Sequence, residues 1–164
     1  EKGRNWLLAL WYFKQMQQGC IQPNLITISA VISACEKGER WLEALSLLSS
    51  CSLYGIQPDT IMHNAVISAL EKGRQWQWVI EVMREATGTS SALNMISFNA
   101  AMSACEKCNE WMYALHLLEA TARRSLSPDV VSFSACISAC ASGRQWEGAL
   151  ALFHGMRDQR VSPD

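Results

Sequence analysis

The chain has 164 residues, of which 49% are apolar and 18% charged, with nine glycines and four prolines. This composition excludes collagen-like, low-complexity and disordered chains, because it provides enough apolar residues for a packed core. The 14 lysine and arginine residues face 15 acidic residues, so the formal net charge is −1 and no global positive field attracts nucleic acid. Any nucleic-acid binding must depend on local charges.

Seven cysteines, an odd number, are spread along the chain without a secretory signal peptide before them. We therefore expect a reducing or intracellular environment rather than a disulfide framework. The longest uncharged run, from Ala86 to Cys105, contains many small polar residues, so no transmembrane helix is predicted. Because the chain begins with Glu1 and ends in Pro163-Asp164, which repeats an internal boundary, we interpret it as a segment of a longer protein.

Tryptophans and prolines recur at a constant interval of 35 residues. They are Trp6, Trp41, Trp76, Trp111 and Trp146, and Pro23, Pro58, Pro128 and Pro163, with Leu93 in the one vacant proline position. A fixed period of this length is the signature of a repeat architecture. The sequence therefore divides into the C-terminal part of one repeat, 1–24, and four complete repeats, 25–59, 60–94, 95–129 and 130–164.

Within each repeat the apolar residues are spaced as on two helices. In 25–59, a first stripe consists of Ile28, Val31, Ile32 and Cys35, and a second begins at Trp41. Repeat 60–94 is the least regular, because Val79 replaces a small alanine and the polar run 87–91 stands where its second helix should end. We expect a shortened helix and a loose loop there.

The first helices are followed by residues suited to a left-handed C-cap, namely Gly38, Gly73, Cys108-Asn109 and Gly143. Each repeat is thus predicted to be a helical hairpin that cannot bury its apolar face alone. The expected fold is all-α, a right-handed α-solenoid of stacked helix-turn-helix hairpins with a 35-residue period and a concave inner surface. The segments form one continuous solenoid.

These features resemble the pentatricopeptide repeat family. The resemblance rests on a 35-residue hairpin ending in Pro-Asp, an Asn or Ser at its fifth place, a buried Ser-Ala-Cys and an Ala-Leu pair early in the second helix. It covers the whole chain, and segments 28–38 and 143–150 resemble the form of the repeat found in photosynthetic protists. A tetratricopeptide repeat, with a period of about 34 residues, is disfavoured because five tryptophans would fall out of step.

The resemblance implies sequence-specific binding of single-stranded RNA in a chloroplast or mitochondrion, the chloroplast being favoured, with one base read per repeat. The fifth and last residues of a repeat would hydrogen-bond the base, and second residues of adjacent repeats would clamp it. The reading pairs are Ser29 with Asp59, Asn64 with Asn94, Asn99 with Asp129, and Ser134 with Asp164; the clamp residues are Ile26, Ile61, Ile96 and Val131. The family's code then predicts the core 5′-G-C/U-U-G-3′.

In this family, phosphate contacts come from a lysine near the end of the first helix. The matching residues here are Lys2, Lys37, Lys72 and Lys107, and Ser142 breaks the series. Four such contacts predict a salt slope of roughly −3, at about 0.7 per contact with a single strand.

Structural alternatives exist for several of these residues. The residues that precede the first helices, Asn24, Asp59, Asn94 and Asp129, are also favoured N-cap types. The second-place Ile and Val residues could belong to the core, and the tryptophans are interpreted as packing elements between repeats. The fifth residues are harder to explain structurally, because Ser and Asn are poor helix formers beyond a first turn.

No catalytic or metal site is predicted, and the protein is interpreted as a non-enzyme without cofactors. Cys105 and Cys108 have the spacing of half a zinc site or a redox pair, but they also match a core cysteine and a capping position of the repeat. His63, His116 and His154 occupy different phases of the repeat, without the partners that a catalytic triad requires.

Two functions remain open at this point. One is an organellar RNA-binding adaptor in RNA stabilisation, processing, editing or translation, which the four reading pairs favour. The other is a scaffold that binds protein subunits of a large organellar assembly such as a ribosome, photosystem or respiratory complex, which the near-zero net charge favours.

Overall fold

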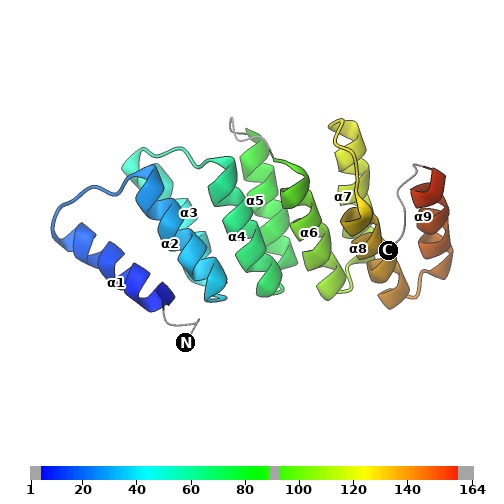
Figure 1. Ribbon diagram of the computed structural model, residues 1–164, viewed down its shortest axis with the longest axis horizontal. Helices are drawn as coiled ribbons and strands as arrows, with labels where there is room; N and C mark the ends of the chain where they lie inside the picture. The colour runs from blue at the N-terminus through cyan, green and yellow to red at the C-terminus, as the bar shows by residue number, and fades with distance from the viewer. Residues whose placement is uncertain (1–4, 89–92, 159–164) are drawn as a thin grey trace.

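The computed structural model describes residues 5–88 and 93–158, and this part of the chain is helical, without strands (Figure 1). The helices are α1 (Asn5–Gln18), α2 (Leu25–Lys37), α3 (Trp41–Ser50), the short 3₁₀ helix η1 (Cys51–Tyr54), α4 (Thr60–Lys72), α5 (Trp76–Gly88), α6 (Met95–Lys107), α7 (Trp111–Arg123), α8 (Val130–Ser142) and α9 (Trp146–Asp158). The first helices of the repeats begin at residues 25, 60, 95 and 130. The prediction of an all-α repeat solenoid is therefore confirmed.

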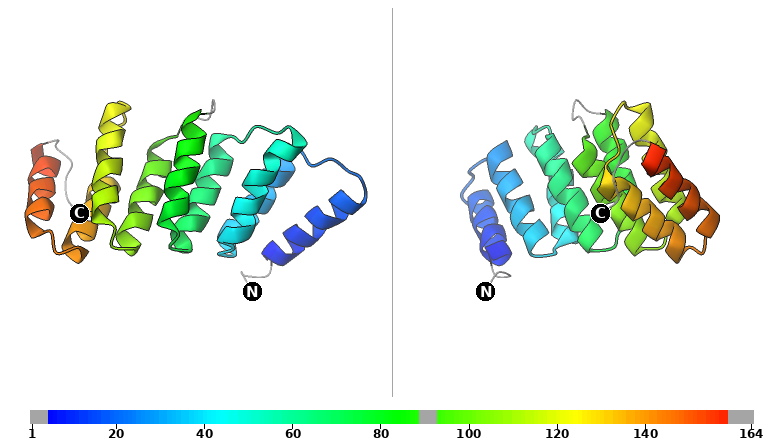
Figure 2. Two further views of the ribbon diagram at one scale, coloured as in Figure 1. Left: turned by 180° about the vertical axis from the view of Figure 1, so that it is seen from behind. Right: turned by 45° about the vertical axis from the view of Figure 1, so that its right-hand side comes forward.

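The helices form two layers. First helices of successive repeats pack on one another, α2 on α4, α4 on α6 and α6 on α8. The second helices α3, α5 and α7 each pack against the first helix of their own repeat and that of the next, as α3 does with α2 and α4. Figures 1 and 2 show the two layers from opposite sides. We call the layer of α2, α4, α6 and α8 the first-helix face.

The apolar stripes of the helices meet between the layers. In α2, Ile28, Ile32 and Cys35 are fully buried, as the helical spacing predicts. Burial is also the main reason why the thiol pKa values of Cys105 and Cys136 are raised to about 12. A thiol that stays protonated is a poor nucleophile and metal ligand. These cysteines therefore act as small core residues.

The glycines after the first helices do not adopt the predicted left-handed conformation. Their φ angles are −90° at Gly38, −77° at Gly73 and −80° at Gly143, and the next residue is left-handed instead, as at Glu39 with φ 57°. A Cβ on Gly73 would lie 2.5 Å from Cδ1 of Trp41. The position requires glycine because an indole from the preceding repeat fills the space of a side chain.

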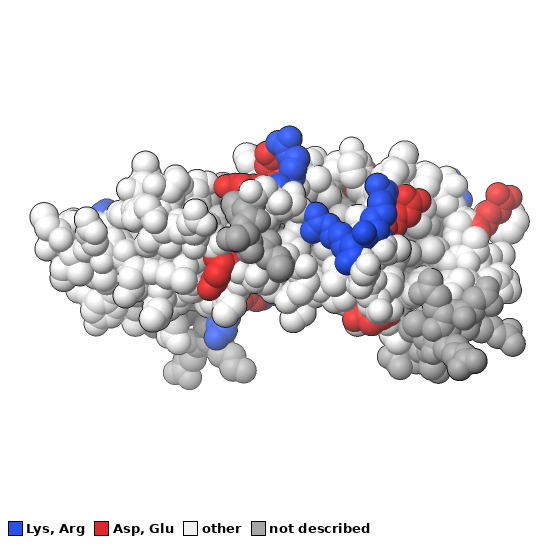
Figure 3. Space-filling view, turned by 90° about the horizontal axis from the view of Figure 1, so that it is seen from above, with Lys and Arg blue, Asp and Glu red and all other residues white. Residues whose placement is uncertain are grey.

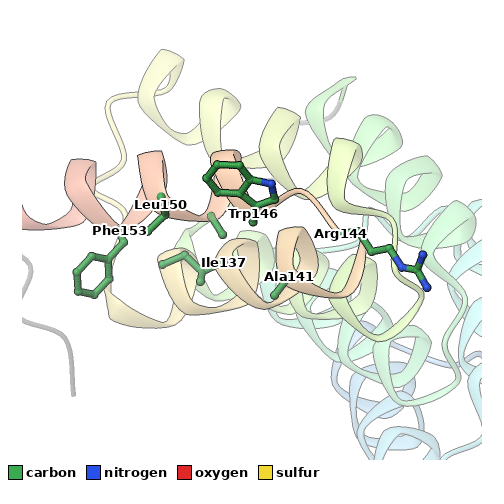
Figure 4. A pocket seen from close by; sticks show the side chains of 7 residues that line it. Ile137, Ala141, Arg144, Trp146, Leu150 and Phe153 are labelled. Atoms are coloured by element: carbon green, nitrogen blue, oxygen red, sulfur yellow. The ribbon is translucent and has the colours of Figure 1, made fainter.

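Two boundaries differ from this arrangement. At the boundary after α6, Cys108 stands in the glycine position and left-handed Asn109 (φ 61°) follows it. The ring of Trp76, from the preceding repeat, packs on Tyr113, with 4.5 Å between the ring centroids. In the last described repeat Trp146 is 66% exposed. With residues of α8 and α9 it lines an apolar pocket of about 670 Å³ (Figure 4).

The expected shortening of the second helix in repeat 60–94 is wrong. Helix α5 has 13 residues, as many as α7, and continues through Gly88. Val79 is fully buried in the position that alanine occupies elsewhere. The predicted loose loop lies largely at residues 89–92, outside the described residues. Among the helices that are described, none has the length and apolar character needed to cross a bilayer.

Candidate functional site

Four β-branched side chains form an exposed row at the beginnings of the first helices. They are the predicted clamp residues Ile26, Ile61, Ile96 and Val131, which are 77%, 66%, 66% and 55% exposed. The alternative that they belong to the core is therefore wrong. Leaving a large apolar side chain in water forgoes the free energy of its burial. The row is thus an apolar surface available for a ligand.

The last residues of the repeats cap the first helices. Side-chain oxygens accept hydrogen bonds from the backbone N–H three residues later, at 2.8 Å for Asn24, 2.8 Å for Asp59, 3.2 Å for Asn94 and 2.9 Å for Asp129. The N-cap interpretation is correct for all four. An amide or carboxylate has further hydrogen-bonding capacity beyond one such bond. Capping therefore leaves these groups able to contact a second partner.

Two of the predicted reading pairs are joined by direct hydrogen bonds. Asn99 Nδ2 lies 3.1 Å and 3.0 Å from the two carboxylate oxygens of Asp129, to which it donates. Asn64 Nδ2 donates to Asn94 Oδ1 over a longer distance of 3.4 Å. The helix stacking thus brings together residues that are 30 positions apart in sequence.

The other two pairs differ. Ser29 and Asp59 are both described, and no hydrogen bond joins them, while the partner of Ser134 is Asp164, which lies outside the described residues. All four fifth residues nevertheless reach the surface: Ser29, Asn64 and Asn99 are half-buried and Ser134 is exposed. None is fully buried, so each fifth residue has part of its surface open to solvent.

Two buried serines that the sequence analysis did not single out also contact the reading pairs. Ser132 Oγ donates to Asn99 Oδ1 at 2.7 Å, and Ser97 Oγ donates to Asn64 Oδ1. Both serines are fully buried and belong to capping boxes with the N-cap residue three positions earlier. In the sequence, these capping boxes are indicated by an Asn or Asp three residues before a Ser.

The carboxyl of Asp129 is held ionised by its neighbours. Partial burial raises its pKa, but hydrogen bonds from the Ser132 backbone N–H, the Ser132 hydroxyl and the Asn99 amide outweigh that effect. The net result is a pKa below the ordinary value of 3.8. Reading pair 99/129 therefore presents a negative charge and amide groups side by side.

The predicted phosphate lysines have acidic partners. Lys72 Nζ lies 3.0 Å from Glu36 Oε1 and Lys107 Nζ lies 2.9 Å from Glu71 Oε1. Each glutamate belongs to the preceding repeat and also accepts a serine hydroxyl of the lysine's own helix, from Ser68 or from Ser103. These lysines therefore link neighbouring repeats.

The remaining lysines of the series are placed differently. Lys37 is exposed, and Lys2 lies outside the described residues.

Figure 3 looks down on the side where α2 and α4 begin, and Lys and Arg side chains there form separate groups interspersed with Asp and Glu. Positive potential on this side is therefore local rather than continuous.

The cysteine candidates and His63 behave as structural residues, whereas His116 and His154 are exposed. Cys105 is buried, and Cys108 Sγ donates to the Arg74 carbonyl oxygen at 3.3 Å. No group of three or more metal-ligand side chains occurs in residues 5–88 and 93–158. His63 is buried with Nδ1 2.9 Å from the Asp59 carbonyl oxygen.

Comparison with known proteins gives repeat-level and structural matches. A family model described as the PPR repeat matches residues 26–56 and 131–161. No curated protein matches the sequence. The pentatricopeptide repeat protein PPR10 from maize is 16% identical with a TM-score of 0.81, and the match covers 93% of this chain and 22% of PPR10. PPR10 in complex with an 18-nt psaJ RNA element gives a TM-score of 0.74.

A second structural match covers most of a domain. The PPR domain of Arabidopsis thaliana protein-only RNase P 1, in complex with tRNA, is 8% identical with a TM-score of 0.84. This match covers 98% of the present chain and 84% of that domain. At such identities the shared property is the fold. The chain spans less than a quarter of PPR10 but most of the length of the RNase P domain.

Proposed function

Because the chain is a pentatricopeptide repeat protein, we propose that it binds single-stranded RNA along the first-helix face, one base per repeat. The observation that carries the proposal is the exposed β-branched row beside the hydrogen-bonded reading pairs. Recognition of an unstacked base requires contact with its flat faces and hydrogen bonds at its edge. The repeats supply both kinds of group at a regular spacing.

The structural matches support this assignment. Two proteins with the same fold, PPR10 and the RNase P domain, have been crystallised with RNA. We assign to this chain a non-catalytic role as an adaptor that holds a transcript for stabilisation, processing, editing or translation. Its proposed location is an organelle, the chloroplast before the mitochondrion.

A binding experiment with defined RNAs tests the proposal. The wild-type protein is titrated with an unstructured oligonucleotide that contains 5′-G-C/U-U-G-3′, and each core base is varied in turn. We expect Asn99→Ser to shift preference at the third base from U towards a purine while the other positions keep theirs. A flat base profile for both wild type and variant would contradict base reading.

A second candidate function is a protein-binding scaffold in a large organellar assembly. The glutamate partners of Lys72 and Lys107 favour it, because they lower the positive potential available for phosphate. The scaffold predicts polypeptide on the first-helix face in the native complex. An ordered oligonucleotide found there instead would contradict the scaffold function.

A further inference from the structure

Ser97 and Ser132 occupy the third position of their repeats and reach back to the fifth residue of the repeat before. The side chains of both are shielded from solvent, and each hydroxyl contacts an asparagine that belongs to a reading pair. Since the serines are buried, a base cannot reach them. Any influence they have on recognition must pass through the asparagines.

An asparagine amide can turn over, which exchanges its donor and its acceptor. At Asn99 both orientations are not equivalent, because Nδ2 faces the Asp129 carboxylate and Oδ1 faces the Ser132 hydroxyl at 2.7 Å. The inverted amide would place an oxygen against the carboxylate and leave the hydroxyl without that acceptor. The serine therefore contacts the oxygen end of the amide, while Asp129 contacts its nitrogen end.

The Ser132 hydroxyl has one proton, which is shared between two acceptors, Asn99 Oδ1 at 2.7 Å and Asp129 Oδ1 at 2.9 Å, and it thereby links the two members of the pair. The Ser132 backbone N–H contacts the same Asp129 oxygen at 2.9 Å. In the other pair, Ser97 Oγ lies 3.2 Å from Asn94 Oδ1 in addition to its bond with Asn64. The neutral Asn94 attracts the Asn64 amide less strongly than a carboxylate would. The serine is therefore the more important restraint in that pair.

The identity of the third residue varies with that of the fifth residue of the preceding repeat. Where the fifth residue is asparagine, the third residue of the next repeat is serine, as in Asn64 with Ser97 and Asn99 with Ser132. Where the fifth residue is Ser29, the corresponding residue is Met62, which has no hydroxyl. The hydroxyl thus accompanies the side chain whose orientation needs to be defined.

We propose that Ser97 and Ser132 are specificity-positioning residues that fix the amide orientation of Asn64 and Asn99, so that each presents a defined N–H donor and oxygen acceptor to a base. This proposal rests on the proposed RNA-binding function. It enlarges the reading unit from two side chains to three, with the third contributed by the following repeat.

The contact can be tested first in the free protein. The side-chain amide signals of Asn99, assigned by comparison with Asn99→Asp, should show a restricted amide in wild type and a more mobile one in Ser132→Ala. The matched control is Thr27→Ala, which removes an equivalent capping hydroxyl, bonded to Asn24 at 2.7 Å. Unchanged mobility of the Asn99 amide in Ser132→Ala would overturn the proposal.

Base discrimination provides the second measurement. In Ser132→Ala, preference for U over other bases at the position read by repeat 95–129 should fall about fivefold, as expected for loss of one hydrogen bond, and Thr27→Ala should leave it unchanged. Discrimination that persists in Ser132→Ala would also overturn the proposal. If even the wild-type protein showed no base preference, the proposed RNA function would be wrong. The amide signals would still show whether Ser132 restrains the Asn99 amide.

A gain-of-function variant gives an independent test, with circular dichroism to check that it folds, because Met62 is fully buried. Ser29→Asn creates a new asparagine whose neighbouring third residue is Met62. Adding Met62→Ser should sharpen the base preference of that repeat relative to Ser29→Asn alone. Equal preference in the two proteins would count against a positioning role.

Discussion

Replacing Gly73 by alanine isolates the role of the indole at a repeat boundary. The new Cβ would lie 2.5 Å from Cδ1 and 2.8 Å from Cγ of Trp41, so the ring or the turn must move. Overpacking of this kind costs about 1 to 3 kcal/mol. Because the backbone at φ −77° suits alanine, about 0.4 to 1 kcal/mol is recovered from the unfolded state. We expect a net loss of about 1 to 2 kcal/mol.

Thermal and urea unfolding followed by circular dichroism would measure this loss, which corresponds to a fall in Tm of about 2 to 8 °C for a chain of this size. The control is Gly155→Ala in α9, where a Cβ meets nothing within 4 Å and stability should rise by about 0.5 to 1 kcal/mol. Gly73→Ala is then repeated with Trp41→Ala present. If the alanine costs as much without the indole as with it, the ring is not the cause.

Three further predictions concern backbone strain, the ion pairs and pH. Glu39→Gly should raise the free energy of unfolding by about 1 kcal/mol because the left-handed conformation strains glutamate, and Asn109→Gly should raise it less; equal urea midpoints for Glu39→Gly and wild type would refute this. Glu71→Gln should lower the free energy of unfolding by at most about 1 kcal/mol. It should also free Lys107 for a phosphate and steepen the slope of log K against log salt concentration by about 0.7; an unchanged slope would show that Lys107 does not contact phosphate. Because its pKa is lowered, Asp129 stabilises the fold above pH 3.8 and loses this effect as the pH falls through the folded-state pKa, so Asp129→Asn should weaken the acid dependence of the urea midpoint, and identical dependence would contradict the assignment.

The sequence was sufficient to predict the helices because every repeat buries the same faces against equivalent neighbours. An indole recurs in every period and a proline in all but one, and together they set the register. The apolar spacing within a repeat, such as Ile28, Ile32 and Cys35, identifies the buried stripe. The N-caps also followed from local chemistry, since Asp59 bonds a backbone N–H only three residues away. Properties contained within one repeat are thus accessible without a structure.

Properties that depend on two repeats were not accessible in the same way. The sequence suggested a left-handed Gly73, but its glycine is required by Trp41, which lies 32 residues earlier and belongs to the preceding repeat. The pairing of Lys72 with Glu36 spans one period plus one residue, which becomes meaningful only when α2 and α4 are stacked. The contact of Ser132 with Asn99 is of the same kind.

The pairing of lysines with glutamates has a consequence for how affinity would arise. The row of first-helix ends carries Lys37, Lys72 and Lys107 together with Glu36, Glu71 and Glu106, so its charges balance. Two lysines are paired with the glutamate of the preceding repeat, whereas Glu106 has Ser142 in the corresponding place and makes no ion pair among the described residues.

Among the described residues of the row, negative charge is therefore left at the Glu106 end. A phosphate that bound Lys72 or Lys107 would replace the glutamate carboxylate as the partner of that lysine, with little net gain in Coulomb energy. Binding should therefore depend on contacts with the bases more than on the backbone, and the Glu106 end of the row should attract a strand least. Weak salt dependence combined with strong base dependence is the behaviour that this distribution of charge requires.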